Sequence, residues 1–174
     1  DISEDMLLQA VSKYPEMDFK KCSAYELESL GKKFSFVYCL ASIYLFDDHE
    51  KALNSMSKVV NKNGLLIFDF YNKRAFFDKD KDRIEPREKL EYNGVSIERV
   101  RSQKLVGDFV EVSYHYWYDG KEFDVFHRDR LMDLPDLLRI LKKDFKLVMG
   151  LNGYSMSSAD ITRDKYVSLV LERK

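Results

Sequence analysis

Two short, almost wholly apolar segments separated by an amphipathic helical pattern place the strongest limit on the fold of this chain. The segments are residues 34–40 (FSFVYCL) and 65–70 (LLIFDF), and both have the composition of strands that are buried on both faces. Between them, Asp48 precedes apolar residues at helical spacing in 49–60, and an Asn-Gly pair at 63–64 is a typical helix stop. This order predicts a βαβ unit, and therefore a parallel strand pair in an α/β sheet.

The middle of the chain has a different pattern. Four strands are expected there, at residues 87–92, 95–105, 109–117 and 122–130, and they are separated by Asn-Gly, Gly-Asp and Asp-Gly pairs. Two of these pairs are strong signals for two-residue hairpin turns. We therefore expect an antiparallel meander at residues 73–130, inserted into an α/β domain that is made of residues 1–72 and 131–174.

The flanking segments complete an α/β fold. A helix is expected at residues 3–13 and a short strand at 18–22, and a further helix begins near Pro135. Apolar runs at residues 145–150 and 166–171 predict two closing strands. No helical pattern separates these two strands, so they should pair antiparallel.

Composition argues against several functional classes. The 174 residues suffice for one domain of ordinary size, and the formal net charge is −1 with scattered basic residues, so we expect no nucleic-acid partner. No apolar stretch has the length of a membrane span, and the N-terminus lacks a secretory signal pattern. The two cysteines indicate neither a disulfide framework nor a metal site. These features predict a cytoplasmic protein that binds no membrane and no metal.

Several segments follow one another in the order found in a known enzyme family. DISEDMLLQA resembles the segment after the second strand of that family, and FSFVYCL resembles its fourth strand. LNSMSKVVNKNGLLIFDFYN resembles the helix, turn and fifth strand, and FHRDRLMDLPDLLRILKKDFKL resembles a His-x-x-Arg segment with the sixth strand. YVSLVLERK resembles the antiparallel seventh strand. The family is that of the class I S-adenosylmethionine-dependent methyltransferases of the small-molecule type. The resemblance implies a Rossmann-like sheet, S-adenosyl-L-methionine as the cofactor and a small-molecule methyl acceptor.

The resemblance also implies a site for the adenosine part of the cofactor. Asp1 matches the acid that accepts hydrogen bonds from the ribose hydroxyls, although an aspartate before a helix is also a common cap. Ser23 stands where the family often has an aspartate that meets the adenine amino group, and a hydroxyl accepts that bond more weakly than an anion does. The other residues implied to line the cofactor are Ile2, Met6, Ala24, Leu40 and Ala41.

Four further residues are candidates on the acceptor side. His127 matches a histidine that often faces the acceptor pocket, and Arg130 would hold an anionic acceptor. Tyr44 and Tyr71 follow the fourth and fifth strands, at the edge of the sheet where α/β proteins bind ligands. Alignment supplies most of the catalysis in methyl transfer, and a base is required only when the nucleophile arrives protonated. We expect His127, Tyr44 and Tyr71 to be catalytic and Arg130 to bind substrate; a purely structural role is the alternative for each.

A glycine-rich motif of the family has no counterpart here. None of the seven glycines has the Gly-x-Gly-x-Gly spacing that holds the methionine part of the cofactor. We therefore expect an N-terminally incomplete form, in which residues 18–22 and one edge of residues 34–40 lack neighbouring strands. One alternative is a non-catalytic remnant that serves as a binding or oligomerisation module. Another is an unrelated α/β ligand-binding protein. The inserted meander would cover the acceptor pocket or form the contact of a homodimer.

Overall fold

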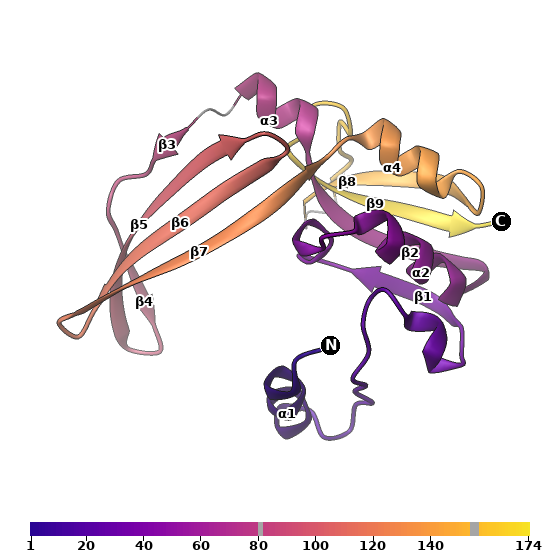
Figure 1. Cartoon of the computed structure of the whole chain (residues 1–174), viewed down its shortest axis with the longest axis horizontal. Coiled ribbons are helices and arrows are strands. Elements are labelled where there is room, and N and C mark those ends of the chain that lie inside the picture. Colours follow the sequence, from indigo (N-terminus) through magenta and orange to yellow (C-terminus); the bar gives the residue numbers. More distant parts are fainter. Residues whose placement is uncertain (80–81, 154–156) are drawn as a thin grey trace.

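A sheet with the strand order β1-β2-β9-β8 forms one half of the protein, which we call the α/β body (Figure 1). The computed structural model describes residues 1–79, 82–153 and 157–174, and its body strands are β1 (Phe34–Cys39), β2 (Val60–Asn72), β8 (Phe145–Asn152) and β9 (Tyr166–Arg173). Strand β1 runs parallel to β2, and α2 (His49–Val59) lies between them in sequence, so the predicted βαβ unit is confirmed. Strand β9 runs antiparallel to β2 and β8, as expected for the closing strands. Part of the connection from β8 to β9, residues 154–156, lies outside the described residues.

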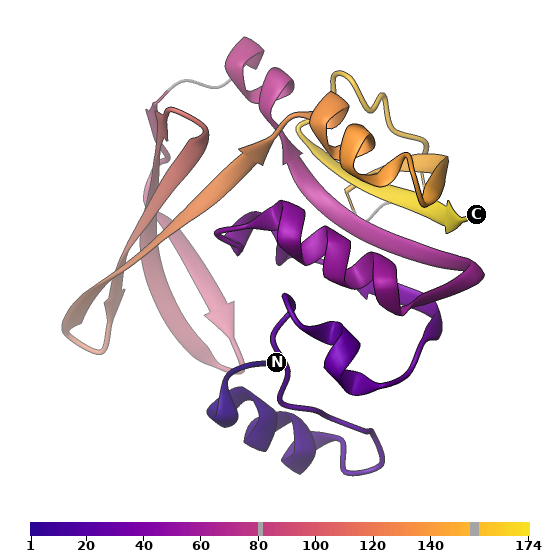
Figure 2. The ribbon, with the colours of Figure 1, turned by 45° about the vertical axis from the view of Figure 1, so that its right-hand side comes forward.

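Helices α2 and α4 (Leu134–Leu141) pack against each other over one face of the body (Figure 2). Helix α2 begins at the expected residue because Asp48 Oδ1 accepts a hydrogen bond from the backbone N–H of Lys51 at 2.8 Å. The apolar faces of the two helices and alternate residues of β2 and β9 form the main core. This core includes Leu53, Met56, Leu66, Phe68, Phe70, Leu137, Leu141, Val167, Leu169 and Leu171.

The N-terminal segment lies beside the body and contains α1 (Glu4–Lys13). Ser3 caps this helix as predicted, since its Oγ accepts a hydrogen bond from the Met6 backbone N–H at 3.3 Å. No residue of α1 is buried. Two short 3-10 helices follow, η1 (Leu27–Leu30) and η2 (Ile43–Leu45). Among the helices that the structure describes, none combines the length and apolar character that a bilayer-spanning segment needs.

The second half is an antiparallel meander that diverges from the body at the end of β2 (Figures 1 and 2). It consists of β3 (Arg83–Ile84), β4 (Glu88–Tyr92), β5 (Val95–Val106), β6 (Phe109–Tyr118) and β7 (Lys121–Met132). The four predicted strands are confirmed. Positive φ angles of 50° and 76° at Asn93 and Gly94, and of 49° and 67° at Asp119 and Gly120, fit the predicted hairpin turns.

The meander and the body share one sheet through a very short contact. Strand β2 pairs with β1 over Leu65–Phe68, and three residues later Tyr71 and Asn72 pair with Leu131 and Met132 of β7. A small second core lies next to this junction, and its buried members are Phe76, Val110, Val112 and Leu131. Phe76 belongs to α3 (Lys73–Lys79), which the sequence pattern did not predict.

Three local expectations are wrong. Residues 18–22 form no strand, because no strand ladder reaches them and their backbone contacts are hydrogen bonds between Asp1 and the peptide groups of Lys20 and Cys22. Strand β1 is not buried on both faces, since Phe36 is 50% and Tyr38 63% exposed.

Helix α2 also ends earlier than predicted, at Val59, and the Asn-Gly pair lies inside β2 instead of after the helix. Asn63 has a φ of 61°, and a side chain at Gly64 would meet the carbonyl oxygen of Asn61 at 2.9 Å. The pair therefore allows an irregularity in the β1-β2 register rather than a helix stop.

Candidate active site

A cavity of about 830 Å³ lies between the N-terminal segment, the end of β1 and the segment that leads to α2. Its walls bring together five of the seven residues that the sequence assigned to the cofactor, which are Asp1, Ile2, Ser23, Ala24 and Leu40. Leu45, Phe46 and Met56 add apolar surface, and Asp47 adds a carboxylate. Met6 and Ala41 do not line this cavity.

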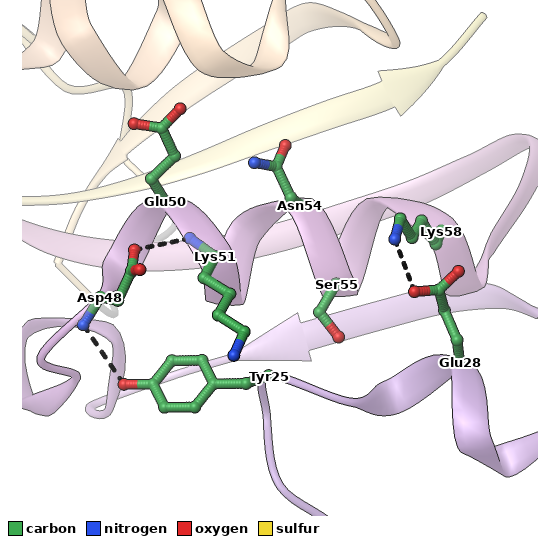
Figure 3. A pocket seen from close by; sticks show the side chains of 8 residues that line it. All are labelled: Tyr25, Glu28, Asp48, Glu50, Lys51, Asn54, Ser55 and Lys58. Carbon is green, nitrogen blue, oxygen red and sulfur yellow. Dashed lines mark hydrogen bonds and ion pairs between the residues drawn. The ribbon is translucent and has the colours of Figure 1, made fainter.

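The Ser23–Ala24 wall of the cavity is held in place by α2. The Tyr25 hydroxyl accepts a hydrogen bond from the backbone N–H of Asp48 at 3.3 Å, and the Leu27 backbone N–H donates to Ser55 Oγ at 2.9 Å. Figure 3 shows Tyr25 beside the start of α2 and an ion pair of 2.6 Å between Lys58 and Glu28 further along the helix. Helix α2 and its cap residue Asp48 thus hold the segment that follows Ser23 and Ala24.

The polar groups of the cavity suit a nucleoside. Asp1 Oδ1 accepts a hydrogen bond from the Ser3 backbone N–H at 2.9 Å, so this carboxylate also fixes the start of α1, as the capping alternative predicted. Ser23 Oγ accepts from the Tyr25 backbone N–H at 3.2 Å, and its own hydroxyl hydrogen remains a donor. A carboxylate and a hydroxyl thus line one cavity together with apolar side chains, which are the kinds of contact that ribose hydroxyls and an adenine ring require.

A buried carboxylate holds the turn that follows β1. Asp69, on β2, is fully buried, and each of its oxygens lies 2.9 Å from the backbone nitrogen of Ala41. Ala41 has a φ of 53°, a conformation that a residue other than glycine adopts only when its surroundings hold it. The Tyr166 hydroxyl on β9 also donates to Asp69. Asp69 was not predicted as a site residue, and its place in an otherwise apolar strand was the only sequence signal.

Tyr44 and Tyr71, two of the three predicted catalytic residues, lie together at the carboxyl end of β2. Their ring centroids are 4.7 Å apart, and the Tyr71 ring is 5.1 Å from that of Tyr166 and 5.5 Å from that of Phe76. Burial raises the pKa of Tyr71 to about 12, and the negative charge of Asp129 contributes to the rise. Tyr71 therefore remains a neutral phenol at physiological pH, which can donate a hydrogen bond but cannot serve as the base.

His127, the third predicted catalytic residue, lies on the face of β7 that carries the second core. Its ring stacks on Tyr114 with centroids 5.8 Å apart, and its Nε2 is 3.3 Å from Asp129 Oδ2. Asp129 is 4% exposed, and burial raises the pKa of its carboxyl group, against the opposing effect of His127. The sequence analysis missed Asp129, although its position two residues after His127 on a strand places both on one face.

Arg130 points away from His127, because side chains alternate along a strand and residues three positions apart face opposite sides. Its Nη1 donates a hydrogen bond to the backbone oxygen of Asp47 at 3.1 Å, and its guanidinium lies 5.3 Å from the ring of Phe109. The structure therefore places Arg130 against the segment that contains Asp47 and lines the cavity, on the opposite face of β7 from His127.

Residues 1–68 match a family model that is described as a methyltransferase domain. No curated protein sequence matches the chain. Among solved structures, a S-adenosylmethionine-dependent methyltransferase from Clostridium acetobutylicum is similar over 99% of this chain and 72% of its own, with 18% identity and a TM-score of 0.76. An amino pentose methyltransferase from Micromonospora echinaspora is similar over 100% of this chain and 72% of its own, with 14% identity and a TM-score of 0.78.

A sugar N-methyltransferase from Streptoalloteichus has the same fold, with 19% identity and a TM-score of 0.74 over 98% of this chain and 68% of its own. The family match identifies the domain type, and the solved structures show its fold. The predicted α/β fold class and S-adenosylmethionine as the cofactor agree with both findings. Residues 1–68 therefore match a methyltransferase domain, and the whole chain has the fold of class I S-adenosylmethionine-dependent methyltransferases.

Proposed function

We propose that this domain transfers a methyl group from S-adenosylmethionine to a nitrogen atom of a small-molecule acceptor. The observation that carries the proposal is the position of Asp69. This carboxylate binds the turn at Ala41, next to the cofactor cavity, and also the Tyr166 hydroxyl, whose ring contacts Tyr71. The site for the methyl donor and the aromatic site for the acceptor would therefore both be held in place by the buried carboxylate of Asp69.

Nitrogen is favoured over other acceptor atoms by the chemistry of the aromatic cluster. Tyr44 packs on Tyr71, the negative charge of Asp129 acts on Tyr71, and Tyr114 stacks on His127, which faces Asp129. Such surroundings stabilise a cation, and both an amine before transfer and the product ammonium carry positive charge. Solved relatives that are named amino pentose, sugar N- and glycopeptide N-methyltransferases support the same choice.

On the cofactor side, S-adenosylmethionine would supply an electrophilic sulfonium methyl group. Asp1 would accept hydrogen bonds from the ribose hydroxyls, and Ser23 and Ala24 would meet the adenine edge. Ile2 and Leu40 provide apolar walls in the same cavity. Met6 and Ala41 do not line the cavity, so their effect on the cofactor would be indirect. Ala41 would act by fixing the turn that carries Leu40.

On the acceptor side, His127 would serve as the base. A nitrogen nucleophile needs a free lone pair, and His127 is a partly exposed imidazole whose Nε2 is already oriented by Asp129. Tyr44 and Tyr71 would orient the acceptor through their rings and phenol groups. Arg130 would bind an anionic group of the acceptor, but only if the acceptor extends to the segment that contains Asp47.

We also propose that residues 73–130 form a separate insertion that covers the acceptor. Its β5-β6-β7 face carries Tyr114 and His127 and packs against Phe76 and Tyr71. A homodimer contact through the outer face of the meander is compatible with this role.

The first test measures cofactor binding and methyl transfer separately. Saturating S-adenosylhomocysteine should raise the melting temperature, because a ligand that binds only the folded state stabilises it. Mass spectrometry should then detect one added methyl group on an amino sugar such as glucosamine and none on glucose. If the ligand causes no shift in this chain or in one extended before Asp1, methyl transfer is excluded and the non-catalytic module is favoured. A shift in the extended chain alone would support the expected incomplete form.

A further inference from the structure

Asp129 has an arrangement that a structural carboxylate does not require. Its side chain is 6% exposed, yet its Oδ1 accepts no hydrogen bond from any residue that the structure describes. A buried carboxylate oxygen without a donor is destabilising, and such groups in native proteins usually mark a ligand or a functional role. The other oxygen, Oδ2, faces His127 Nε2 at 3.3 Å. One oxygen is thus oriented within the protein and the other is unpartnered.

The charges around Asp129 do not complete an ion pair. Arg101 lies on the same face of the meander, but its Nη1 donates to Glu85 Oε1 and to Gln103 Oε1, both at 2.9 Å. Its guanidinium is thus bound to Glu85, Gln103 and Tyr114, and its charge acts on Asp129 only from a distance, without a hydrogen bond to Oδ1. The net effect of the surroundings is to raise the pKa of the Asp129 carboxyl group, with burial as the main cause. A cation that donates a hydrogen bond would satisfy both the charge and the unpartnered oxygen.

The groups next to Asp129 suit an ammonium ion better than a metal ion. The charge of Asp129 acts on Tyr71, and His127, which faces Asp129, stacks on Tyr114. Aromatic faces stabilise organic cations and do not satisfy the coordination demand of a metal. Among the residues described, no group of three or more His, Cys, Asp and Glu side chains is arranged to hold a metal ion.

We propose that Asp129 binds the ammonium group of the acceptor and so restricts the substrates to cationic amines. This inference rests on the proposed methyl transfer and names its substrate class. Asp129 Oδ1 accepts one N–H of the acceptor ammonium, and Tyr71 lies within reach of the same charge. The Tyr114 ring is already stacked on His127 and has the Arg99 guanidinium 5.2 Å from its centroid, so it forms the wall behind His127. Tyr71, which the charge of Asp129 affects, contacts Tyr166, and the Tyr166 hydroxyl donates to Asp69, which holds the Ala41 turn.

The same pair of residues accounts for the proton that must leave the acceptor. One N–H bond of the ammonium breaks, its proton moves to a ring nitrogen of His127 that carries a lone pair, and the N–H electron pair stays on the amine nitrogen as its lone pair. His127 becomes an imidazolium ion, which Asp129 stabilises through the Nε2 contact. The charge is conserved in this step, and no further reactant is required.

Methylammonium is the smallest probe of this site. We would label the full-length chain with 13C at the aspartate side-chain carboxyl groups and assign the Asp129 resonance from the spectrum of Asp129→Asn. Titration with methylammonium chloride should shift this resonance saturably, with a dissociation constant on the order of 10 mM for a ligand of two non-hydrogen atoms. Potassium chloride at equal ionic strength and methanol should produce no saturable shift. Asp129→Asn, which preserves the shape of the side chain, should weaken methylammonium binding at least tenfold.

Asp124→Asn is the matched control, because Asp124 lies on the same strand and also contacts a histidine, His115, but its side chain is 76% exposed. This variant should bind methylammonium like the wild type. Equal shifts with methylammonium and potassium, or unchanged binding by Asp129→Asn, would overturn the proposal. The wild-type titrations with methylammonium and methanol decide the question even if Asp129→Asn does not fold.

Binding of S-adenosylhomocysteine and methyl transfer are measured in parallel. Transfer to neutral alcohols without methylammonium binding would overturn this inference and leave methyl transfer intact. Saturable methylammonium binding at Asp129 together with no effect of S-adenosylhomocysteine would support this site and overturn the proposed function.

Discussion

Replacement of Asp69 by alanine should weaken both the fold and the cofactor site. The substitution removes the acceptor of the Ala41 backbone N–H and of the Tyr166 hydroxyl, and both donors lie in partly buried surroundings. A hydrogen bond to a charged group contributes about 1.5–3 kcal/mol. Removal of the carboxylate also removes the cost of burying a charge. The total loss of stability is therefore smaller than the sum of the two lost hydrogen bonds. We expect the free energy of unfolding to fall by about 3 kcal/mol.

The effect on the cofactor follows from the conformation of Ala41. Its φ of 53° is unfavourable for alanine, and Asp69 is the group that binds its N–H. Without Asp69 the turn should relax towards a more common conformation, and Leu40, which lines the cavity, should move with it. Urea unfolding followed by circular dichroism measures the stability, and calorimetry with S-adenosylhomocysteine measures the affinity, which we expect to fall at least tenfold.

Two further variants make the measurement specific. Tyr166→Phe removes one donor and preserves the Ala41 contact, so it should cost about 1–2 kcal/mol and leave the affinity for S-adenosylhomocysteine almost unchanged. Asp124→Ala removes an exposed carboxylate that also accepts a hydrogen bond, from His115, and should cost less than about 0.5 kcal/mol. If Asp69→Ala cost less than about 1 kcal/mol and bound S-adenosylhomocysteine normally, Asp69 would not be the shared support of the two sites.

Three other predictions test the packing and the electrostatics. Gly64→Ala should lower the stability by about 1–3 kcal/mol, because the new methyl group would meet the backbone oxygens of Asn61 and Ser35 at 2.9 and 3.0 Å; an unchanged melting temperature would contradict this. Phe68→Ala should cost about 3–5 kcal/mol in urea unfolding, whereas Phe36→Ala, at a half-exposed position of β1, should cost less than about 1 kcal/mol; similar values would show that β1 is covered in solution. Burial raises the pKa of Asp129 in the folded state above its value in the unfolded chain, so folding takes up a proton there at intermediate pH. The stability of the wild type relative to Asp129→Asn should therefore decrease as the pH rises from about 4 through the raised pKa, and a difference that does not change with pH would refute this.

Local signals in the sequence were sufficient for most of the secondary structure. The turns at Asn93-Gly94 and Asp119-Gly120 need positive φ at both residues, which these residue types tolerate, so the hairpins could be predicted without knowledge of the tertiary structure. The Asn-Gly pair at 63–64 misled the same reasoning, because identical chemistry also permits an irregular strand. A strand at residues 18–22 needs a neighbouring strand, and no pattern within the segment itself reveals whether one is present.

The candidate site was predictable only in part, for a related reason. Tyr44 and Tyr71 follow parallel strands, and the carboxyl ends of such strands meet at one edge, so their proximity follows from the βαβ unit. Asp69 could not be recognised as the group that holds the Ala41 turn, because its partners lie on other elements. Asp129 lies on the same strand as its partner His127, so their shared face was predictable, but the burial of its carboxylate was not. Ala41 and Tyr166 are 28 and 97 residues distant from Asp69 in the sequence.

The junction between the two halves has a consequence for cooperativity. Strands β2 and β7 share only the pairs of Tyr71 with Leu131 and of Asn72 with Met132, and each half has its own core. A contact this short transmits little stabilisation from one core to the other, so the meander should open and close at a lower free energy than the body. Amide hydrogens of β5 and β6 should then exchange as one group, earlier than those of β2 and β9. Strand β7, which carries both His127 and Asp129, would thus belong to the half of the molecule that can move aside for an acceptor.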